Sequence, residues 1–95
     1  MASITNPAEE PVEQISHRAR DWYDIGEKLL ESVFEGKHSK ELRPLGRHLC
    51  NKGVRAVDTK GEDFVFSETL TKPDATAVRE IAKSKGMTEK SGSAT

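Results

Sequence analysis

Residues 12–35 read VEQISHRARDWYDIGEKLLESVFE, and this stretch decides the fold class that the sequence predicts. Its main apolar residues recur at intervals of three and four, which is the period of one face of an α-helix. They are Ile15, Ala19, Trp22, Gly26, Leu29 and Val33, and the stripe is widened by Ile25, Leu30 and Phe34. Pro11 suits the first turn of a helix and Gly36 suits the position just after its end. We therefore expect one long helix over residues 12–35.

A second, shorter helix is expected over residues 44–52. Pro44 is favourable in a first helical turn, where its missing N–H would have no intrahelical partner. Leu45 and Leu49 give the segment an apolar side. The sequence Asn51-Lys52-Gly53 is typical of a helix end.

The next stretch, VRAVDTKGEDFVFSE over residues 54–68, predicts a β-hairpin. Two runs rich in Val and Phe flank Asp58-Thr59-Lys60-Gly61, which has Asp at the first and Gly at the last position of a type I turn. Phe64 and Phe66 would share one face of the second strand, with Val65 on the other. A lone hairpin cannot cover two apolar faces, so one face is expected to pack on helices and the other to meet a partner.

The last element is a helix that opens at Lys72-Pro73-Asp74 and stops at Gly86. Residues 1–11 and 87–95 are polar or small and show no apolar periodicity, so we expect them to be flexible tails. The predicted architecture is a single α+β domain over residues 12–86, in the order helix, helix, strand, strand, helix.

The small size of the chain favours self-association. With 95 residues, of which 34% are apolar, the core is expected to be marginal. A helix over residues 12–35 would be about 36 Å long at 1.5 Å per residue. A compact domain of this size has a diameter of only about 29 Å. The helix would overhang its own domain while staying apolar, and we therefore expect a homodimer.

The sequence also predicts a cytoplasmic protein. Cys50 is the single cysteine and has no partner for an internal disulfide, which fits a reducing compartment. Residues 1–11 lack the basic start and apolar run of a signal peptide. No apolar stretch is long enough to span a bilayer, so no membrane association is expected.

The net charge of −1 hides a separation of charges along the chain. Residues 9–35 contain eight acidic and three basic residues, whereas residues 36–60 contain seven basic and two acidic ones. Such a separation is a marker of interaction surfaces. The acidic and basic segments could pair within one chain or across an interface, and the sequence leaves both arrangements open.

No constellation of residues indicates catalysis. The sequence lacks phosphate-binding glycine loops, paired C-x-x-C cysteines, H-E-x-x-H and nucleophile-elbow motifs. His48 and Cys50 would point apart on a helix and could not chelate one ion. We therefore predict that the protein is not an enzyme and has no catalytic residues, no metal site and no cofactor.

The leading hypothesis is a non-catalytic protein-interaction module, such as a regulator, an inhibitor or an adaptor, that is also homodimeric. Missing catalytic motifs, the overlong apolar helix and the two-sided hairpin all favour it. The residues expected to face the protein partner are Tyr23, Asp24, Glu27, Glu31 and Val65.

The alternative is a nucleic-acid-binding protein that uses the basic segment 37–60. Two helices followed by a hairpin with a basic tip are similar to part of a winged helix-turn-helix, in which the second helix enters the major groove. The resemblance implies nucleic-acid contacts by Arg43, Arg47, Lys52, Arg55 and Lys60. A sequence pI near 6.3 lacks the basic excess that drives phosphate binding.

Overall fold

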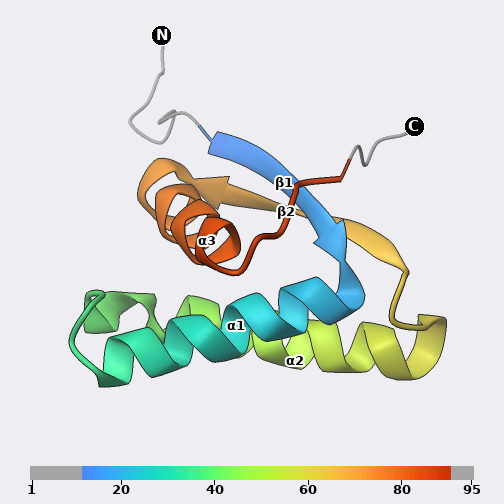
Figure 1. Cartoon of the computed structure of the whole chain (residues 1–95), viewed down its shortest axis with the longest axis horizontal. Helices are drawn as coiled ribbons and strands as arrows, with labels where there is room; N and C mark the ends of the chain where they lie inside the picture. The colour runs from blue at the N-terminus through green and yellow to red at the C-terminus, as the bar shows by residue number, and fades with distance from the viewer. Residues whose placement is uncertain (1–11, 91–95) are drawn as a thin grey trace, which may run out of the picture.

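A computed structural model describes residues 12–90 of the chain, so the predicted tail over residues 1–11 lies outside the described residues. Three helices, two strands and one short 3-10 turn follow each other along the chain (Figure 1). In order they are β1 (Val12–Arg18), α1 (Ala19–Phe34), η2 (Lys40–Leu42), α2 (Arg43–Lys60), β2 (Val65–Thr71) and α3 (Lys72–Ser84). The prediction of an α+β fold is confirmed, but the order of the elements differs from the predicted one.

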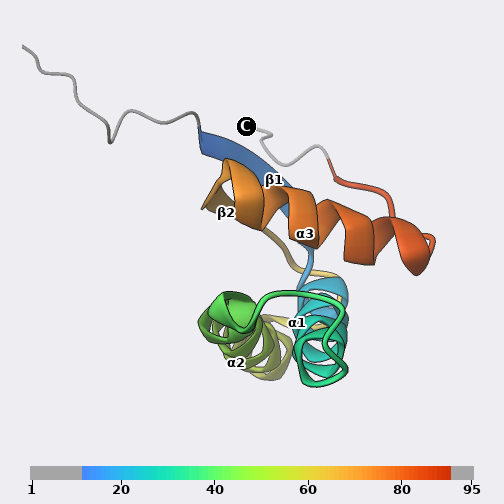
Figure 2. The same ribbon diagram turned by 90° about the vertical axis from the view of Figure 1, so that its left-hand side faces the viewer.

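The elements form two layers. The helices α1 and α2 pack side by side as a helical hairpin, and the sheet together with α3 lies over one side of that hairpin (Figure 2). The sheet has two antiparallel strands, with Val12 opposite Thr71 at one end and Arg18 opposite Val65 at the other. Its strands therefore come from parts of the chain that are far apart in the sequence, with α1 and α2 between them.

The predicted long helix over residues 12–35 is wrong in its first third, because residues 12–18 form β1. Ile15 and Ala19 fit the helical period, yet Ile15 and His17 also alternate along a strand and are both fully buried. Pairing with β2 decides between the two patterns. Helix α1 begins at Ala19, whose N–H donates to the Phe64 carbonyl at 2.7 Å and so satisfies a first-turn donor.

The predicted helix over residues 44–52 is confirmed but ends too early, and the predicted hairpin over residues 54–68 is wrong. Residues 43–60 form one continuous helix of 18 residues, α2, and no strand precedes β2 in this part of the described chain. Gly61, expected in a hairpin turn, instead ends α2 with a φ of 101°. Strand β2 then begins only at Val65.

Glycines explain why α2 continues through Gly53. A Cβ on Gly53 would lie 2.6 Å from the Tyr23 backbone nitrogen, and one on Gly26 would lie 2.5 Å from the Cys50 nitrogen. Both positions are therefore close contacts between the two helix backbones. Gly53 does not terminate a helix; it allows α1 and α2 to pack at short range, which outweighs its low helix propensity.

Trp22 lies at the centre of the core, between the hairpin and the sheet. It is fully buried, and its ring stacks on Phe66 with centroids 5.7 Å apart. Its indole N–H donates to the Phe66 carbonyl at 2.9 Å, so its polar atom is satisfied. The other large, fully buried apolar side chains are Ile15, Ile25, Leu29, Leu49 and Val78.

The closing helix is confirmed, since α3 begins at Lys72 with proline in its first turn. After Gly86, which has a φ of 72°, the chain returns to the sheet. Met87 packs against the core, and the Lys90 N–H donates to the Ser16 carbonyl at 2.8 Å. The described start of the predicted C-terminal tail over residues 87–95 is thus attached to the domain.

The length argument for a homodimer does not hold. Helix α1 has 16 residues and is about 24 Å long, so it does not overhang the domain. Within residues 12–90, no helix combines the length and the apolar character needed to cross a membrane.

Candidate functional site

One side of the helical hairpin is covered and the opposite side is bare. On the covered side, α1 buries Trp22, Ile25 and Leu29 in the core. Helix α2 contacts the sheet on the same side, because Lys52 forms an ion pair with Glu68 of β2 at 2.7 Å. The opposite side faces away from the sheet and α3 (Figures 1 and 2). We call it the lower face; no described element packs on it.

The lower face of α1 carries an apolar stripe. Tyr23, Leu30 and Phe34 follow each other at helical spacing, and Phe34 is 89% exposed. The Tyr23 hydroxyl donates to the Glu27 carboxylate at 3.0 Å, which raises the pKa of Tyr23. This bond fixes the tyrosine ring across the helix surface and leaves its edge half-exposed.

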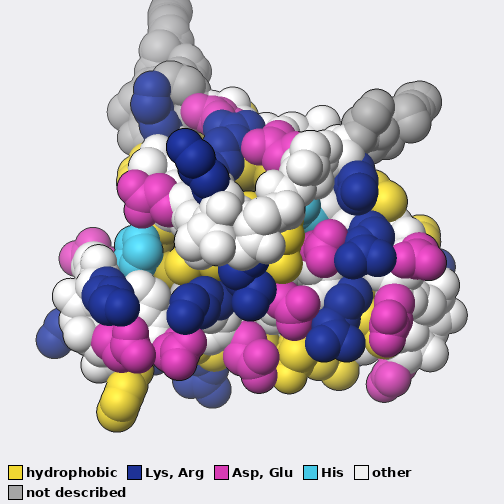
Figure 3. Space-filling view, viewed as in Figure 1, with side chains coloured by type: hydrophobic (Ala, Val, Ile, Leu, Met, Phe, Trp, Pro, Cys, Tyr) yellow, Lys and Arg dark blue, Asp and Glu magenta, His cyan; other side chains and the backbone are white. Residues whose placement is uncertain are grey.

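Helix α2 contributes the other half of the lower face. At about 100° per residue, Arg43, Arg47, Val54 and Asp58 fall on one stripe. Val54 is 43% exposed. A shallow pocket of about 150 Å³ joins the two helices, and it is lined by Arg20, Tyr23, Val54, Val57 and Asp58. In Figure 3, hydrophobic side chains reach the lower margin of the molecule among acidic and basic ones.

Three sets of residues make up the lower face. The apolar seam consists of Tyr23, Leu30, Phe34, Val54 and Val57. The acidic edge consists of Glu27 and Glu31 on α1, and the basic edge of Arg43 and Arg47 on α2. At the other end of the hairpin, where α1 begins and α2 ends, the charges of the two helices are reversed. There α1 carries the basic Arg20 and α2 carries the acidic Asp58.

The charges on the two edges are not neutralised across the hairpin. Among residues 12–90, no ion pair joins α1 to α2, and neither Arg43 nor Arg47 takes part in a described ion pair. Only Glu35, at the end of α1, meets a cation of the next segment, with Lys37 at 3.2 Å. The charge separation along the sequence therefore survives on the surface of the fold.

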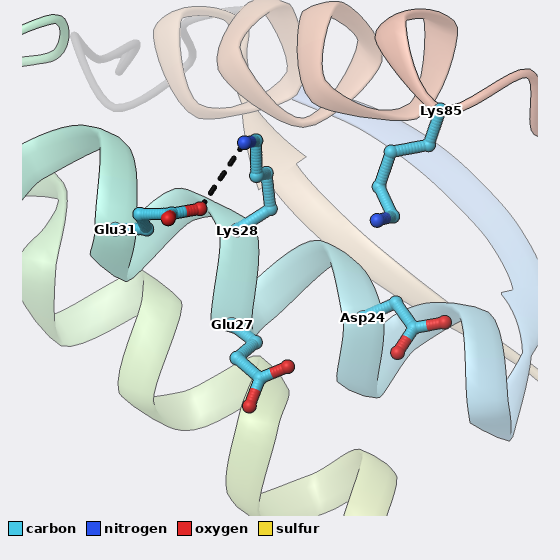
Figure 4. Close-up of a pocket in the computed structure, with 5 residues that line it drawn as sticks. All are labelled: Asp24, Glu27, Lys28, Glu31 and Lys85. Atoms are coloured by element: carbon cyan, nitrogen blue, oxygen red, sulfur yellow. Dashed lines mark hydrogen bonds and ion pairs between the residues drawn. The ribbon is translucent and has the colours of Figure 1, made fainter.

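The predicted partner residues do not form one surface. Tyr23, Glu27 and Glu31 belong to the lower face. Asp24 lies at the flank of α1 below α3, in a depression that Glu27 and Glu31 also line and toward which Lys85 reaches (Figure 4). Val65 is 36% exposed in β2 opposite Arg18, far from the hairpin's bare side.

The flank shown in Figure 4 is a shallow, charged depression. It is lined by Asp24, Glu27, Lys28, Glu31 and Lys85, and Lys28 pairs with Glu31 at 3.1 Å. Its carboxylates are half-exposed or exposed, so this cluster is a salt-bridged surface.

The predicted nucleic-acid residues are likewise divided. Arg43 and Arg47 are neighbours on the basic edge. Lys52 is held by Glu68 and lies over the Phe66 ring, and Lys60 lies over the Phe64 ring at 5.2 Å. Arg55 is exposed on the outer flank of α2, about 80° around the helix from Arg47.

Among residues 12–90, no group of three or more His, Cys, Asp or Glu side chains is placed so that it could hold a metal ion. The Cys50 thiol points to the Tyr23 carbonyl at 3.9 Å between the helices, and burial raises its pKa. His48 turns toward the sheet and bonds Glu68 at 3.1 Å.

The sequence pattern does not predict that His17 is buried. His17 is fully buried edge-on against Trp22, with ring centroids 5.1 Å apart, and neither ring nitrogen has a hydrogen-bond partner. Burial lowers the pKa of His17, although Asp21 and Glu89 oppose the shift. The signal in the sequence is its alternation with Ile15, which is typical of a strand and not of the helix predicted there.

The burial of His17 predicts a pH-dependent stability. The unfolded histidine binds a proton near its ordinary pKa of 6.5, whereas the folded one does so only at lower pH. Below that value the unfolded state binds more protons, so stability is lost as the pH falls. We expect the free energy of unfolding to drop as the pH falls below about 7, by at most about 1.4 kcal/mol per pH unit.

Urea unfolding at several pH values measures this slope. His17→Leu should flatten it, while His48→Gln, which changes an exposed histidine, should leave it in place. If His17→Leu does not alter the slope of stability against pH, the pH dependence does not come from His17.

In comparisons with known proteins, no protein-family model, curated protein or solved structure matches the chain.

Proposed function

We propose that this chain is a small, non-catalytic protein-interaction module that binds a protein through the lower face of the α1–α2 hairpin. In this proposal the sheet and α3 serve as the scaffold, because they bury the other side of both helices. The lower face would be the partner surface expected of a regulator, an inhibitor or an adaptor.

The observation that carries the proposal is the apolar seam between two charged edges. Phe34, 89% exposed, is the most exposed large apolar side chain among residues 12–90. Covering such a side chain stabilises a complex by about 1.5–3 kcal/mol. An apolar centre with a charged rim is the usual anatomy of a protein interface. Tyr and Arg, present here as Tyr23, Arg43 and Arg47, are frequent among the residues that dominate binding energy.

Site-specific photo-crosslinking in the protein's own host cells tests this function. A benzoylphenylalanine at position 34 replaces one exposed aromatic ring by another, and the same group at Thr69, exposed on the sheet, is the matched control. We expect discrete protein adducts from position 34 and none from position 69. Equal adducts from both positions, or no adducts from position 34, would refute the proposed surface.

A second candidate function is nucleic-acid binding by α2. It is favoured by one observation: Arg43 and Arg47 share one stripe of α2, Arg55 is exposed on the adjoining flank of the same helix, and none of the three is in a described ion pair. If these arginines neutralise backbone phosphates, the affinity for nucleic acid should fall steeply as the salt concentration rises.

Binding of a mixed pool of DNA and RNA oligonucleotides, followed by fluorescence anisotropy, tests this candidate. Arg43→Glu combined with Arg47→Glu should abolish salt-sensitive binding, whereas Lys83→Glu, a charge reversal on α3, should have little effect. Absence of binding by the wild-type chain at low salt would remove the candidate.

A further inference from the structure

The charges of the lower face are arranged so that the face complements itself. We propose that its partner is the lower face of a second copy of this chain, related by a two-fold axis parallel to the hairpin, so that α1 of each copy packs on α2 of the other. This inference rests on the proposed function, because it names the partner of the same surface.

The register of the hairpin gives the positions along its length. Helix α1 passes α2 in the antiparallel sense, with Leu30 beside Gly46 and Tyr23 beside Gly53. Glu31 is therefore level with the part of α2 between Arg43 and Arg47. At the other end, Arg20 and Asp58 line the same pocket and so lie at the same level.

A two-fold rotation about an axis parallel to the hairpin keeps each residue at its level and exchanges the helices. The acidic edge of one copy then lies opposite the basic edge of the other. The same rotation also brings opposite charges together at the other end of the hairpin, because it places Arg20 opposite Asp58 of the second copy. Each contact occurs twice, and the apolar seams meet between the charged edges.

The charge of Glu27 favours this axis over the other simple arrangement. A two-fold axis across the middle of the hairpin would lay α1 on α1 end for end. That rotation brings the Glu31 end near Arg20 of the second copy, but it places Glu27, at the middle of α1, opposite Glu27 of the second copy. Like charges facing each other cost energy and disfavour such a pairing. The axis parallel to the hairpin also makes α1 antiparallel to the α2 it contacts, as in an up-and-down four-helix bundle.

Charge reversal with restoration tests this arrangement in solution. One variant carries Glu27→Arg and Glu31→Arg, a second carries Arg43→Glu and Arg47→Glu, and a third carries all four changes. All four side chains are exposed on the helix surface, so the fold should persist, and circular dichroism checks this. Light scattering and sedimentation over a concentration series give the dissociation constant of the dimer.

We expect the wild-type chain to dimerise and each double variant to raise the dissociation constant at least tenfold. The fourfold variant, and an equimolar mixture of the two double variants, should recover the dimer, because opposite charges again face each other. A Lys83→Glu control on α3 should dimerise like the wild type.

Several results would overturn the inference: a monomeric wild-type chain at all concentrations, double variants that dimerise normally, or a fourfold variant that stays monomeric. The crosslinking experiment separates this failure from failure of the proposed function. Adducts from position 34 that contain only other proteins would leave the interaction function standing and remove the second copy as its partner.

Discussion

Replacing Trp22 by alanine is expected to lower the free energy of unfolding by about 4 kcal/mol. Truncating a buried aromatic residue costs about 3–5 kcal/mol through lost transfer energy and the cavity that remains. The variant also leaves the Phe66 carbonyl without its indole donor. Domains of this size have a total stability of about 5–10 kcal/mol, so most of the stability of the fold would be lost.

Urea unfolding followed by far-ultraviolet circular dichroism measures the loss. Tyr23→Ala, at the next residue but on the half-exposed lower face, is the matched control and should cost much less. Equal costs for the two changes would contradict the placement of Trp22 in the core and Tyr23 on the surface.

Gly26→Ala is expected to destabilise the fold by about 2 kcal/mol, although alanine is intrinsically the better helix former by about 1 kcal/mol. The new Cβ would lie 2.5 Å from the Cys50 nitrogen and 2.8 Å from the Gly46 oxygen, and neither backbone atom can move without separating the helices. Overpacking of this kind typically costs about 1–3 kcal/mol.

Gly46→Ala provides the control for this prediction. Its Cβ would meet the side chain of Leu30 at 2.9 Å, and a side chain can adopt another rotamer more readily than a backbone can shift. Chemical denaturation should therefore rank Gly26→Ala well below Gly46→Ala in stability. The reverse order would contradict the close approach of α1 and α2 at Gly26.

The part of the fold that could be predicted depends on local signals. Helix α3 begins where Lys72-Pro73-Asp74 places it, because proline in a first turn and the following apolar stripe are both local features. Most of α1 was also predicted, from a stripe that continues without interruption from Trp22 to Val33.

The failures all depend on contacts that are distant in the sequence. The strand identity of residues 12–18 comes from pairing with residues 65–71, because the local alternation of Ile15 and His17 competes with the helical spacing of Ile15 and Ala19. Gly53 is typical of a helix end in the sequence, and only its approach to Tyr23 explains why α2 runs through it.

These failures also explain what was missed in the candidate site. The sequence already places Tyr23, Glu27 and Glu31 on the surface of one helix, because α1 is predicted correctly around them. Val54 was assigned to a strand, so its place beside Tyr23 could not be foreseen. Phe34 was counted in the apolar stripe of the long helix, yet it is exposed beyond the point where the core ends.

Backbone and methyl NMR spectra recorded over a dilution series would show whether two lower faces pair in solution. We expect concentration-dependent shifts for Tyr23, Phe34 and Val54, with the resonances of Val65 and Thr69 on the sheet unchanged. Shifts confined to the sheet, or spectra that do not change with concentration, would contradict this pairing.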